Sequence, residues 1–153
     1  MCSPQNQGDW SMQIERDSSN EAVISTQNIL DQAPDGVIFA DPDGIIRLWN
    51  QAAQTIFGYA ATEALGKSLD IIIPERFRGA HWNGFYKAME TGHTLHSGRV
   101  FRTRSTHKDG SKLYVELTFG MVKDKVGTIQ GSIAIARDAT DRHAEEIQND
   151  SSY

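Results

Sequence analysis

Residues 36–50 read GVIFADPDGIIRLWN, and this stretch decides the fold. Two short runs rich in β-branched and aromatic residues flank the tetrapeptide DPDG. Within it, Pro42 and Gly44 are residue types that tight turns favour. A β-rich run on each side of such a turn predicts an antiparallel hairpin.

Helices are predicted on both sides of this hairpin. Before it, residues 21–33 place apolar side chains at helical spacing, and Pro34 ends the run. After it, Asn50 has the side chain of a helix N-cap for a segment over 51–59. Gly58 is the residue type that ends such a helix.

Three further elements follow before the chain returns to strands. The segment 61–69 predicts one short turn of helix, with Thr62 at its start and Gly66 at its end. Residues 69–73 form a brief apolar element that stops before a proline. A longer helix is predicted over 78–90.

The last part of the domain is rich in strand patterns. Strands are predicted over 99–107, 112–122 and 128–138, separated by two Lys-Asp turns. In the second and third of these strands, apolar and polar side chains alternate. The side chains expected to share a face in the second strand are Leu113, Val115, Leu117, Phe119 and Met121. Those expected to share a face in the third strand are Ile129, Gly131, Ile133, Ile135 and Arg137. Such alternation is typical of an antiparallel sheet with one covered face.

The order of these elements predicts the fold class. Two strands, several helices and three strands indicate an α+β domain with a five-stranded antiparallel sheet and short helices packed on one face. We expect a flexible N-terminal tail over 1–20 and the domain, with its N-terminal flanking helix, over 21–140. Residues 141–153 are expected to begin as a helix and to end as a C-terminal tail.

Composition narrows the classes of function. The chain of 153 residues is 39% hydrophobic and has a formal net charge of −5, which allows a packed core and argues against nucleic acid or an anionic membrane as partner. Its one cysteine, Cys2, excludes a disulfide framework and a cysteine-based zinc site. Because the sequence has no secretory signal and no apolar run of membrane-spanning length, we expect a cytoplasmic protein.

A histidine stands on an otherwise apolar face of the last predicted helix. Helical spacing puts Phe77, His81, Phe85 and either Ala88 or Met89 on that face. The imidazole is either a core group with its own hydrogen bond or a metal ligand, and the residues alone leave both alternatives open. The chain has no metallohydrolase spacing of histidines and no phosphate-binding glycine motif, so we do not expect an enzyme.

Four segments resemble, in order, those of a PAS domain. APDGVIFADPDGIIRLWNQAAQTIFGY (33–59) resembles the opening hairpin and first helix of that family, and ATEALGKSL (61–69) resembles its next segment. HKDGSKLYVELTFG (107–120) resembles the hairpin around its Lys-Asp-Gly turn, and GSIAIARDATDR (131–142) resembles its last strand and Asp-x-Thr exit. The resemblance implies a PAS fold and a sensory module that either holds a small ligand between sheet and helices or holds nothing and dimerises.

A narrower resemblance concerns the segment around His81. IIPERFRGAHWNGF, residues 72–85, is similar to the segment with the haem-ligating histidine in rhizobial oxygen-sensor histidine kinases. This implies haem b (heme b) held through its iron by His81, with His93 near a propionate. His93 and His96 lie in a glycine-flanked loop and are either exposed or act as a propionate partner or a sixth iron ligand.

The same resemblance implies a pocket for a diatomic gas, O2, CO or NO, lined by Leu117 and Phe119. The distal arginine of those sensors falls on Arg99 when counted from the helix and on Phe101 when counted back from the Lys-Asp-Gly turn. If Phe101 takes that position, stabilisation of oxygen by arginine is lost, whereas CO and NO are less affected. The apolar residues expected in the core, which would line the cavity, are Phe77, Phe85, Leu95, Val115, Leu117, Phe119, Ile133 and Ile135.

Two other functions are open for such a domain. One is a redox sensor with non-covalent FAD, because Cys2 lies outside the domain and cannot form a cysteinyl adduct with a flavin. The other is a cofactor-free module that forms a homodimer through the helix at 21–33, which is also compatible with a ligand. In each case we expect the signal to pass to a partner in trans or to an output domain beyond Thr140.

Overall fold

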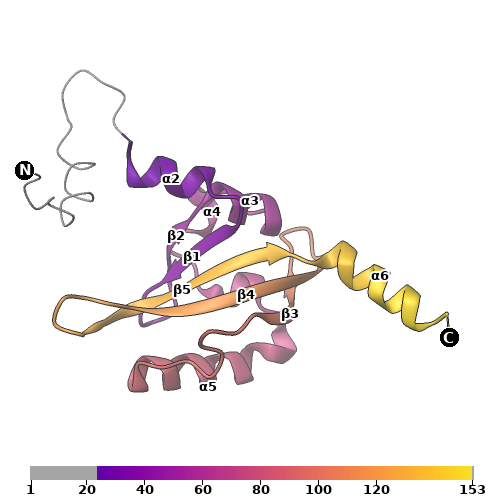
Figure 1. Cartoon of the computed structure of the whole chain (residues 1–153). Coiled ribbons are helices and arrows are strands. Elements are labelled where there is room, and N and C mark those ends of the chain that lie inside the picture. Colours follow the sequence, from indigo (N-terminus) through magenta and orange to yellow (C-terminus); the bar gives the residue numbers. More distant parts are fainter. Residues whose placement is uncertain (1–23, 153) are drawn as a thin grey trace, which may run out of the picture.

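Five antiparallel strands form one sheet in the order β2-β1-β5-β4-β3 (Figure 1). The computed structural model describes residues 24–152, and the tail predicted over 1–20 lies outside them. The strands are β1 (Gly36–Ala40), β2 (Ile46–Trp49), β3 (Phe101–Thr106), β4 (Lys112–Lys123) and β5 (Ile129–Asp138). The helices are α2 (Thr26–Gln32), α3 (Gln51–Phe57), α4 (Ala61–Ala64), the 3-10 helix η1 (Leu69–Ile72), α5 (Glu75–Thr91) and α6 (Thr140–Asp150). The predicted α+β class and its five-stranded antiparallel sheet are confirmed.

The hairpin predicted from residues 36–50 is present as β1 and β2. Its turn is built by the carboxylate of Asp41, whose Oδ1 accepts hydrogen bonds from the backbone N–H of Asp43 at 3.0 Å and of Ile45 at 3.1 Å. Gly44 follows with a φ of 77°, a conformation that glycine adopts without strain. The turn sets a register in which Ile38 lies opposite Trp49.

Asn50 joins three segments as well as capping α3. Its Oδ1 accepts hydrogen bonds from the N–H groups of Val37 at 2.8 Å and Ala53 at 3.0 Å. Its Nδ2 donates to the carbonyls of Leu30 at 2.7 Å and Asp35 at 3.0 Å. The side chain is almost fully buried, with the residue 1% exposed, and it ties α2, β1 and α3 together.

The two faces of the sheet have different surroundings. The inner face packs against α3, α4, η1 and α5, and its core side chains include Ile38, Ala40, Val115, Leu117, Ala134 and Ala136. Successive side chains of a strand point to opposite faces. Strand pairing therefore assigns to the outer face a second row made of Val37, Phe39, Thr118, Ile133 and Ile135. The register of the strands therefore determines which of the predicted site residues face the helices.

Three helix starts differ from the prediction. α2 begins at Thr26 after the N-cap Ser25, so residues 24 and 25 of the helix predicted over 21–33 are not helical. α5 begins at Glu75 and not at residue 78, because Pro74 cannot extend the preceding element and an acidic residue is stabilised in the first turn of a helix. Its predicted end at Gly92 is confirmed, with φ 77°. α4 begins at Ala61, and the carboxylate of Glu63 accepts a hydrogen bond from the N–H of Ala60 at 2.8 Å, so Thr62 is not the cap.

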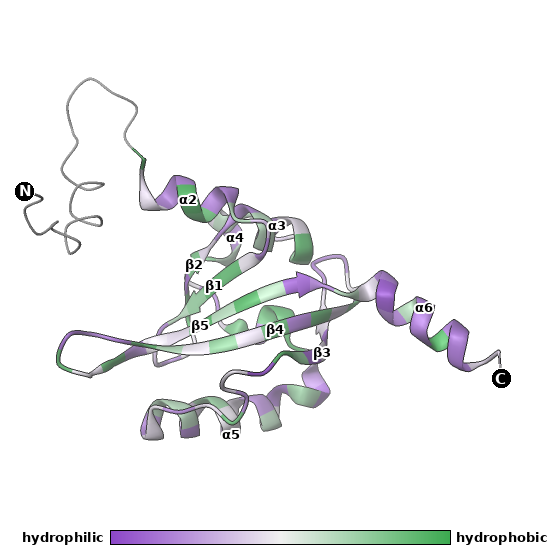
Figure 2. Cartoon of the chain, in the orientation of Figure 1, coloured by the Kyte–Doolittle hydropathy of each residue, from purple (hydrophilic) through white to green (hydrophobic). Residues whose placement is uncertain are grey.

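The exit segment is a longer helix than expected. α6 continues to Asp150, where a tail was predicted, and it projects from the end of β5 (Figure 1). Its residues are mainly hydrophilic, in contrast to the hydrophobic residues of β1 (Figure 2). Across residues 24–152, none of the helices has the length and apolar character needed to cross a membrane.

Candidate ligand site on helix α5

His81 lies on the face of α5 that packs toward the sheet. Phe85 and Ala88 on this face are buried, and Trp82 and Met89 pack against the core. The ring centroid of His81 lies 4.7 Å from that of Trp82 and 5.9 Å from that of Phe85. The imidazole therefore stands among aromatic rings, of which the sequence predicted Phe85.

The Nδ1 atom of His81 is buried and has no hydrogen-bond partner among the described residues. Burial lowers the pKa of the imidazole, and the negative charge of Asp70 opposes this shift only in part. The ring is therefore neutral at physiological pH. A buried polar atom without a partner costs about 1–3 kcal/mol. The hydrogen bond that a purely structural core histidine requires is missing at this atom.

Trp82 is a member of this site that sequence reasoning missed. Its indole Nε1 donates a hydrogen bond to Asp70 Oδ1 at 2.7 Å. The ring covers the turn of the first hairpin so closely that a Cβ atom at Gly44 would lie 2.2 Å from it. The signal in the sequence is its position three residues before Phe85, which puts both rings on one side of the helix.

Phe101, Leu117 and Phe119 come together on the strand side, as predicted. Phe101 in β3 lies opposite Leu117 in β4, so the two side chains share a face. His96, from the loop before β3, stacks on Phe101 with ring centroids 4.3 Å apart and lies 6.3 Å from the ring of Phe119. His96 is thus the loop histidine that adjoins these rings.

The other two predicted residues of this loop are not brought into the cluster. His93 is exposed, and Thr91 Oγ1 accepts a hydrogen bond from its backbone N–H at 3.3 Å. Arg99 is also exposed, ahead of β3, and its N–H donates to the carbonyl of His96 at 3.1 Å. Of the two positions considered for a distal arginine, the one on the inner face carries Phe101.

Four further expectations about the cavity wall are wrong. Phe77 is 37% exposed, because the buried stripe of α5 passes through Trp82. The guanidinium carbon of Arg76 lies 4.5 Å from the centroid of the Phe77 ring. Ile133 lies on the outer face, since it pairs with Gly120 and Phe39 and not with Phe119. Ile135 shares that face, and Leu95 is 85% exposed in the loop before β3.

Two hollows formed by the described residues lie away from His81. One of about 180 Å³ lies on the outer face over Thr118 and Ile135, and an open one lies beside Pro74 and Arg104. Neither includes His81. Within residues 24–152 no group of three or more histidine, cysteine or acidic side chains is close enough to hold a metal ion. A metal ion bound at His81 would therefore take most of its ligands from a bound group and not from these side chains.

The fold agrees with one protein family. The family model described as PAS fold matches residues 30–144, so the chain belongs to the PAS family. The predicted resemblance is thereby confirmed at the level of the family. The chain is a PAS sensory domain, and its candidate site lies between the sheet and the long helix.

Particular relatives narrow the comparison. The chain is 28% identical to the sensor protein FixL of Bradyrhizobium diazoefficiens over 116 residues, which are 71% of this chain and 23% of that protein. It is 30% identical to the cell-division control histidine kinase PdhS of Brucella ovis over 139 residues, which are 88% of this chain and 13% of that protein. The chain thus spans less than a quarter of either relative.

The fold also matches solved structures. The PAS domain of a protein from Colwellia psychrerythraea superposes with a TM-score of 0.65 at 22% identity, covering 74% of this chain and 93% of that one. At this identity the similarity concerns the fold alone. The fold class is therefore supported by sequence family and by structure.

Proposed function

We propose that this chain is a sensor that binds haem b through His81 and responds to a diatomic gas or to redox state. The observation that carries the proposal is the buried, unpartnered Nδ1 of His81. Its lowered pKa keeps the imidazole in the neutral form that coordinates metals. The relationship to FixL, a sensor protein, supports the same role.

The residues fit a haem in chemistry. Bound haem supplies an iron centre that a gas or an electron can reach, and a proximal histidine is a common way of holding it. His81 would hold the group, and Phe85, Leu117 and Phe119 would shield it from water.

The position of Phe101 supports CO or NO over O2 as the signal. A phenyl ring donates no hydrogen bond, whereas an arginine at this inner-face position would do so. His96, from the loop before β3, stacks on Phe101. We therefore propose Phe101, and not Arg99 or His93, as the residue beside the gas ligand.

A hemin titration followed by absorption tests the proposal. We expect a saturable Soret band that shifts on reduction and on addition of CO, and we expect His81→Ala to lose it. His93→Ala is the matched control, because it removes an exposed histidine from the same region. A flat spectrum in the wild type, or identical spectra in wild type and His81→Ala, would contradict the role of His81.

A cofactor-free interaction module is the second candidate, and the exposed apolar residues of the helix before the first strand favour it. In that case the helix over 21–33 pairs two chains. α2 has no buried residue, and Ile24 and Ile29 are 60% and 52% exposed, which supports a homodimer through this helix. Residues 21–23 of the predicted helix lie outside the described part of the chain. The spectrum that tests for haem also detects FAD, which stays an alternative cofactor.

The output of the sensor is also a proposal. A relative that is a histidine kinase supports a signalling partner, reached in trans or through an attached domain. We propose that the PAS domain itself carries no catalytic activity.

A further inference from the structure

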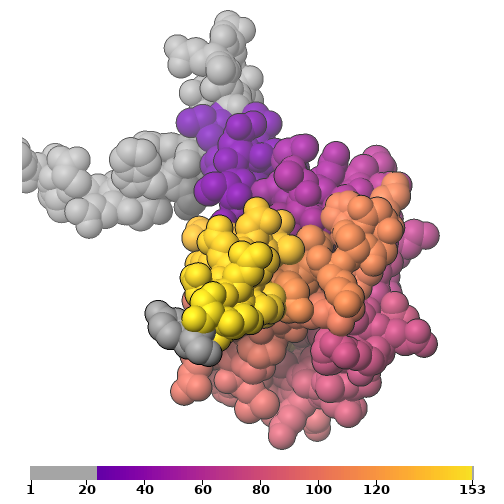
Figure 3. All heavy atoms as spheres, turned by 90° about the vertical axis from the view of Figure 1, so that its right-hand side faces the viewer, coloured from indigo at the N-terminus to yellow at the C-terminus, as the bar shows by residue number. Residues whose placement is uncertain are grey.

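Helix α6 is attached to the sheet at one end and by few groups. No residue of α6 is buried, and in a space-filling view it stands out from the surface of the domain (Figure 3). Its first turn is anchored by two backbone contacts to Tyr114, namely Ala139 N–H to the carbonyl at 2.7 Å and Tyr114 N–H to Thr140 Oγ1 at 3.1 Å. His143 then stacks on the ring of Tyr114, with centroids 3.6 Å apart.

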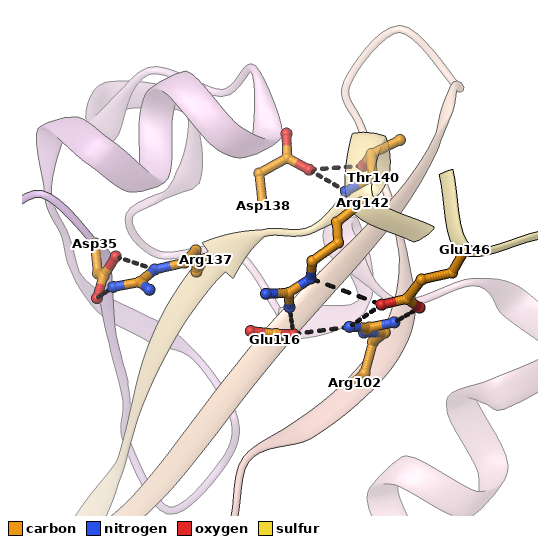
Figure 4. Close-up of polar contacts among 8 residues, drawn as sticks. All are labelled: Asp35, Arg102, Glu116, Arg137, Asp138, Thr140, Arg142 and Glu146. Atoms are coloured by element: carbon orange, nitrogen blue, oxygen red, sulfur yellow. Dashed lines mark hydrogen bonds and ion pairs between the residues drawn. The ribbon is translucent and has the colours of Figure 1, made fainter. Parts of the chain in front are cut away.

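Beyond that turn, charged side chains hold the helix. We call Arg102, Glu116, Arg142 and Glu146 the ion cluster (Figure 4). Arg102 donates to Glu116 Oε1 at 3.0 Å and to Glu146 Oε2 at 2.5 Å. Arg142 also pairs with Glu116, and its Nε lies 4.0 Å from Glu146 Oε1. Each arginine thus contacts one carboxylate of the sheet and one of α6.

Arg102 has a neighbour on the opposite side of the same strand. Phe101 lies on the inner face, opposite Leu117, and Arg102 lies on the outer face, opposite Glu116. β3 is an edge strand that pairs only with β4. A displacement of β3 caused by something pressing on Phe101 therefore also displaces Arg102.

From this geometry we infer that Arg102 couples the inner face of β3 to α6. The guanidinium bridges the edge strand and the helix, so a shift of β3 changes how firmly the second turn of α6 is held. The direction of signalling rests on the proposed function, which places a ligand against Phe101. The bridge itself is tested without any ligand.

The test is hydrogen exchange of the α6 amides in the whole chain. Arg102→Gln removes the bridge, and the opening of α6 should increase by about two- to fivefold, the size expected of a surface ion pair. Arg137→Gln is the matched control, because Arg137 also lies on the outer face and pairs with Asp35 at 3.0 Å but does not touch α6 (Figure 4). Amides of β5 report whether the fold is intact.

Further variants keep the inference falsifiable if Arg102→Gln folds poorly. Glu146→Gln changes only an exposed residue of α6 and should give the same increase. The double variant with Arg102→Gln and Glu146→Gln should show no further increase in hydrogen exchange of the α6 amides. Unchanged α6 exchange in both single variants, or an equal increase in Arg137→Gln, would overturn the bridge.

The coupling needs its own measurement. Phe101→Ala should change α6 exchange by about twofold or more in the wild-type background and not in Arg102→Gln, as expected for coupled residues. An equal effect of Phe101→Ala in both backgrounds would overturn the role of Arg102 in coupling. Neither result depends on hemin, so failure of the haem proposal and failure of the coupling are distinguishable.

Discussion

The indole of Trp82 donates a hydrogen bond to the carboxylate of Asp70 over 2.7 Å, and this contact fixes the ring above the first hairpin turn. The long helix, the 3-10 helix η1 and the hairpin therefore meet at one aromatic side chain.

Gly44 cannot carry a side chain beneath this ring. Gly44→Ala should lower the free energy of unfolding by about 3 kcal/mol. Alanine is strained in the left-handed backbone conformation, and its Cβ would displace the ring of Trp82. Gly66 is the matched control, because its φ of 83° is similar and no atom lies within 4 Å of its added Cβ. Gly66→Ala should cost only about 1 kcal/mol. Urea denaturation of both variants checks this, and equal losses would contradict the contact with Trp82.

Asn50 is the second position where one side chain determines the fold. Asn50→Ala leaves the backbone partners on Leu30, Asp35, Val37 and Ala53 without their hydrogen bonds, and should lower the free energy of unfolding by about 3 kcal/mol. Asn83, exposed on α5, is the control, and Asn83→Ala should change stability by less than about 0.5 kcal/mol. Thermal or urea unfolding measures both. A loss in Asn50→Ala as small as in the control would refute the linking role.

His81 should lower the stability of the ligand-free protein. Replacing it with phenylalanine, a ring with similar helix propensity, removes the unpartnered Nδ1 and should raise the free energy of unfolding by about 1 kcal/mol. The same variant should lose hemin uptake. His93→Phe, at an exposed position, should leave both unchanged. Destabilisation by His81→Phe would mean that the imidazole makes a favourable contact in the core.

Ile29 gives a test of the proposed homodimer. Ile29→Glu places a charge on the exposed apolar surface of α2 and should turn a dimer into a monomer in sedimentation velocity. Ile147→Glu is a close control, since Ile147 is 53% exposed and Ile29 is 52% exposed. A wild-type chain that sediments as a monomer at all concentrations would rule out the dimer. Dissociation by both variants would show that α2 is not the specific contact.

The acid response of α6 follows from Glu146. The hydrogen bond from Arg102 lowers the pKa of this carboxyl below its ordinary value of 4.5. Because the pKa of Glu146 is lowered in the folded state, its ion pair stabilises the attachment of α6 fully at pH values above the ordinary pKa. This stabilisation is lost as the pH falls through the folded-state pKa. Side-chain NMR titration should show a pKa of Glu146 below 4.5 in the wild type and a higher one in Arg102→Gln. The same pKa in both would contradict the pairing.

Local pattern predicted the elements well because the signals are local. Pro42 with Gly44, Asn50 and Gly58 are turn and cap residues, whose conformational preferences act within a few positions. The faces of β5 were harder. Alternation shows that two faces differ, but it does not say which one is covered. The large side chains of Ile133 and Ile135 suggested the core, yet the inner row of β5 is built from Ala134 and Ala136.

The candidate site was predicted in part for a similar reason. His81 and Phe85 share a stripe at helical spacing, so the prediction placed them together. Trp82 was missed because its role depends on Gly44 and Asp70, which come from distant parts of the sequence. Phe77 was misplaced because positions four residues apart drift around a helix of 3.6 residues per turn, and the buried side of α5 follows Trp82 and Met89.

The middle of the sheet is closed by strands from the two ends of the domain. β1 pairs with β5, with Gly36 opposite Ala136, two residues 100 positions apart in the chain. During synthesis the hairpin of β1 and β2 therefore lacks its neighbouring strand until β5 has left the ribosome. Until then its apolar side chains are available to chaperones. The domain is also expected to fold slowly, because its central pairing closes the longest loop of the chain.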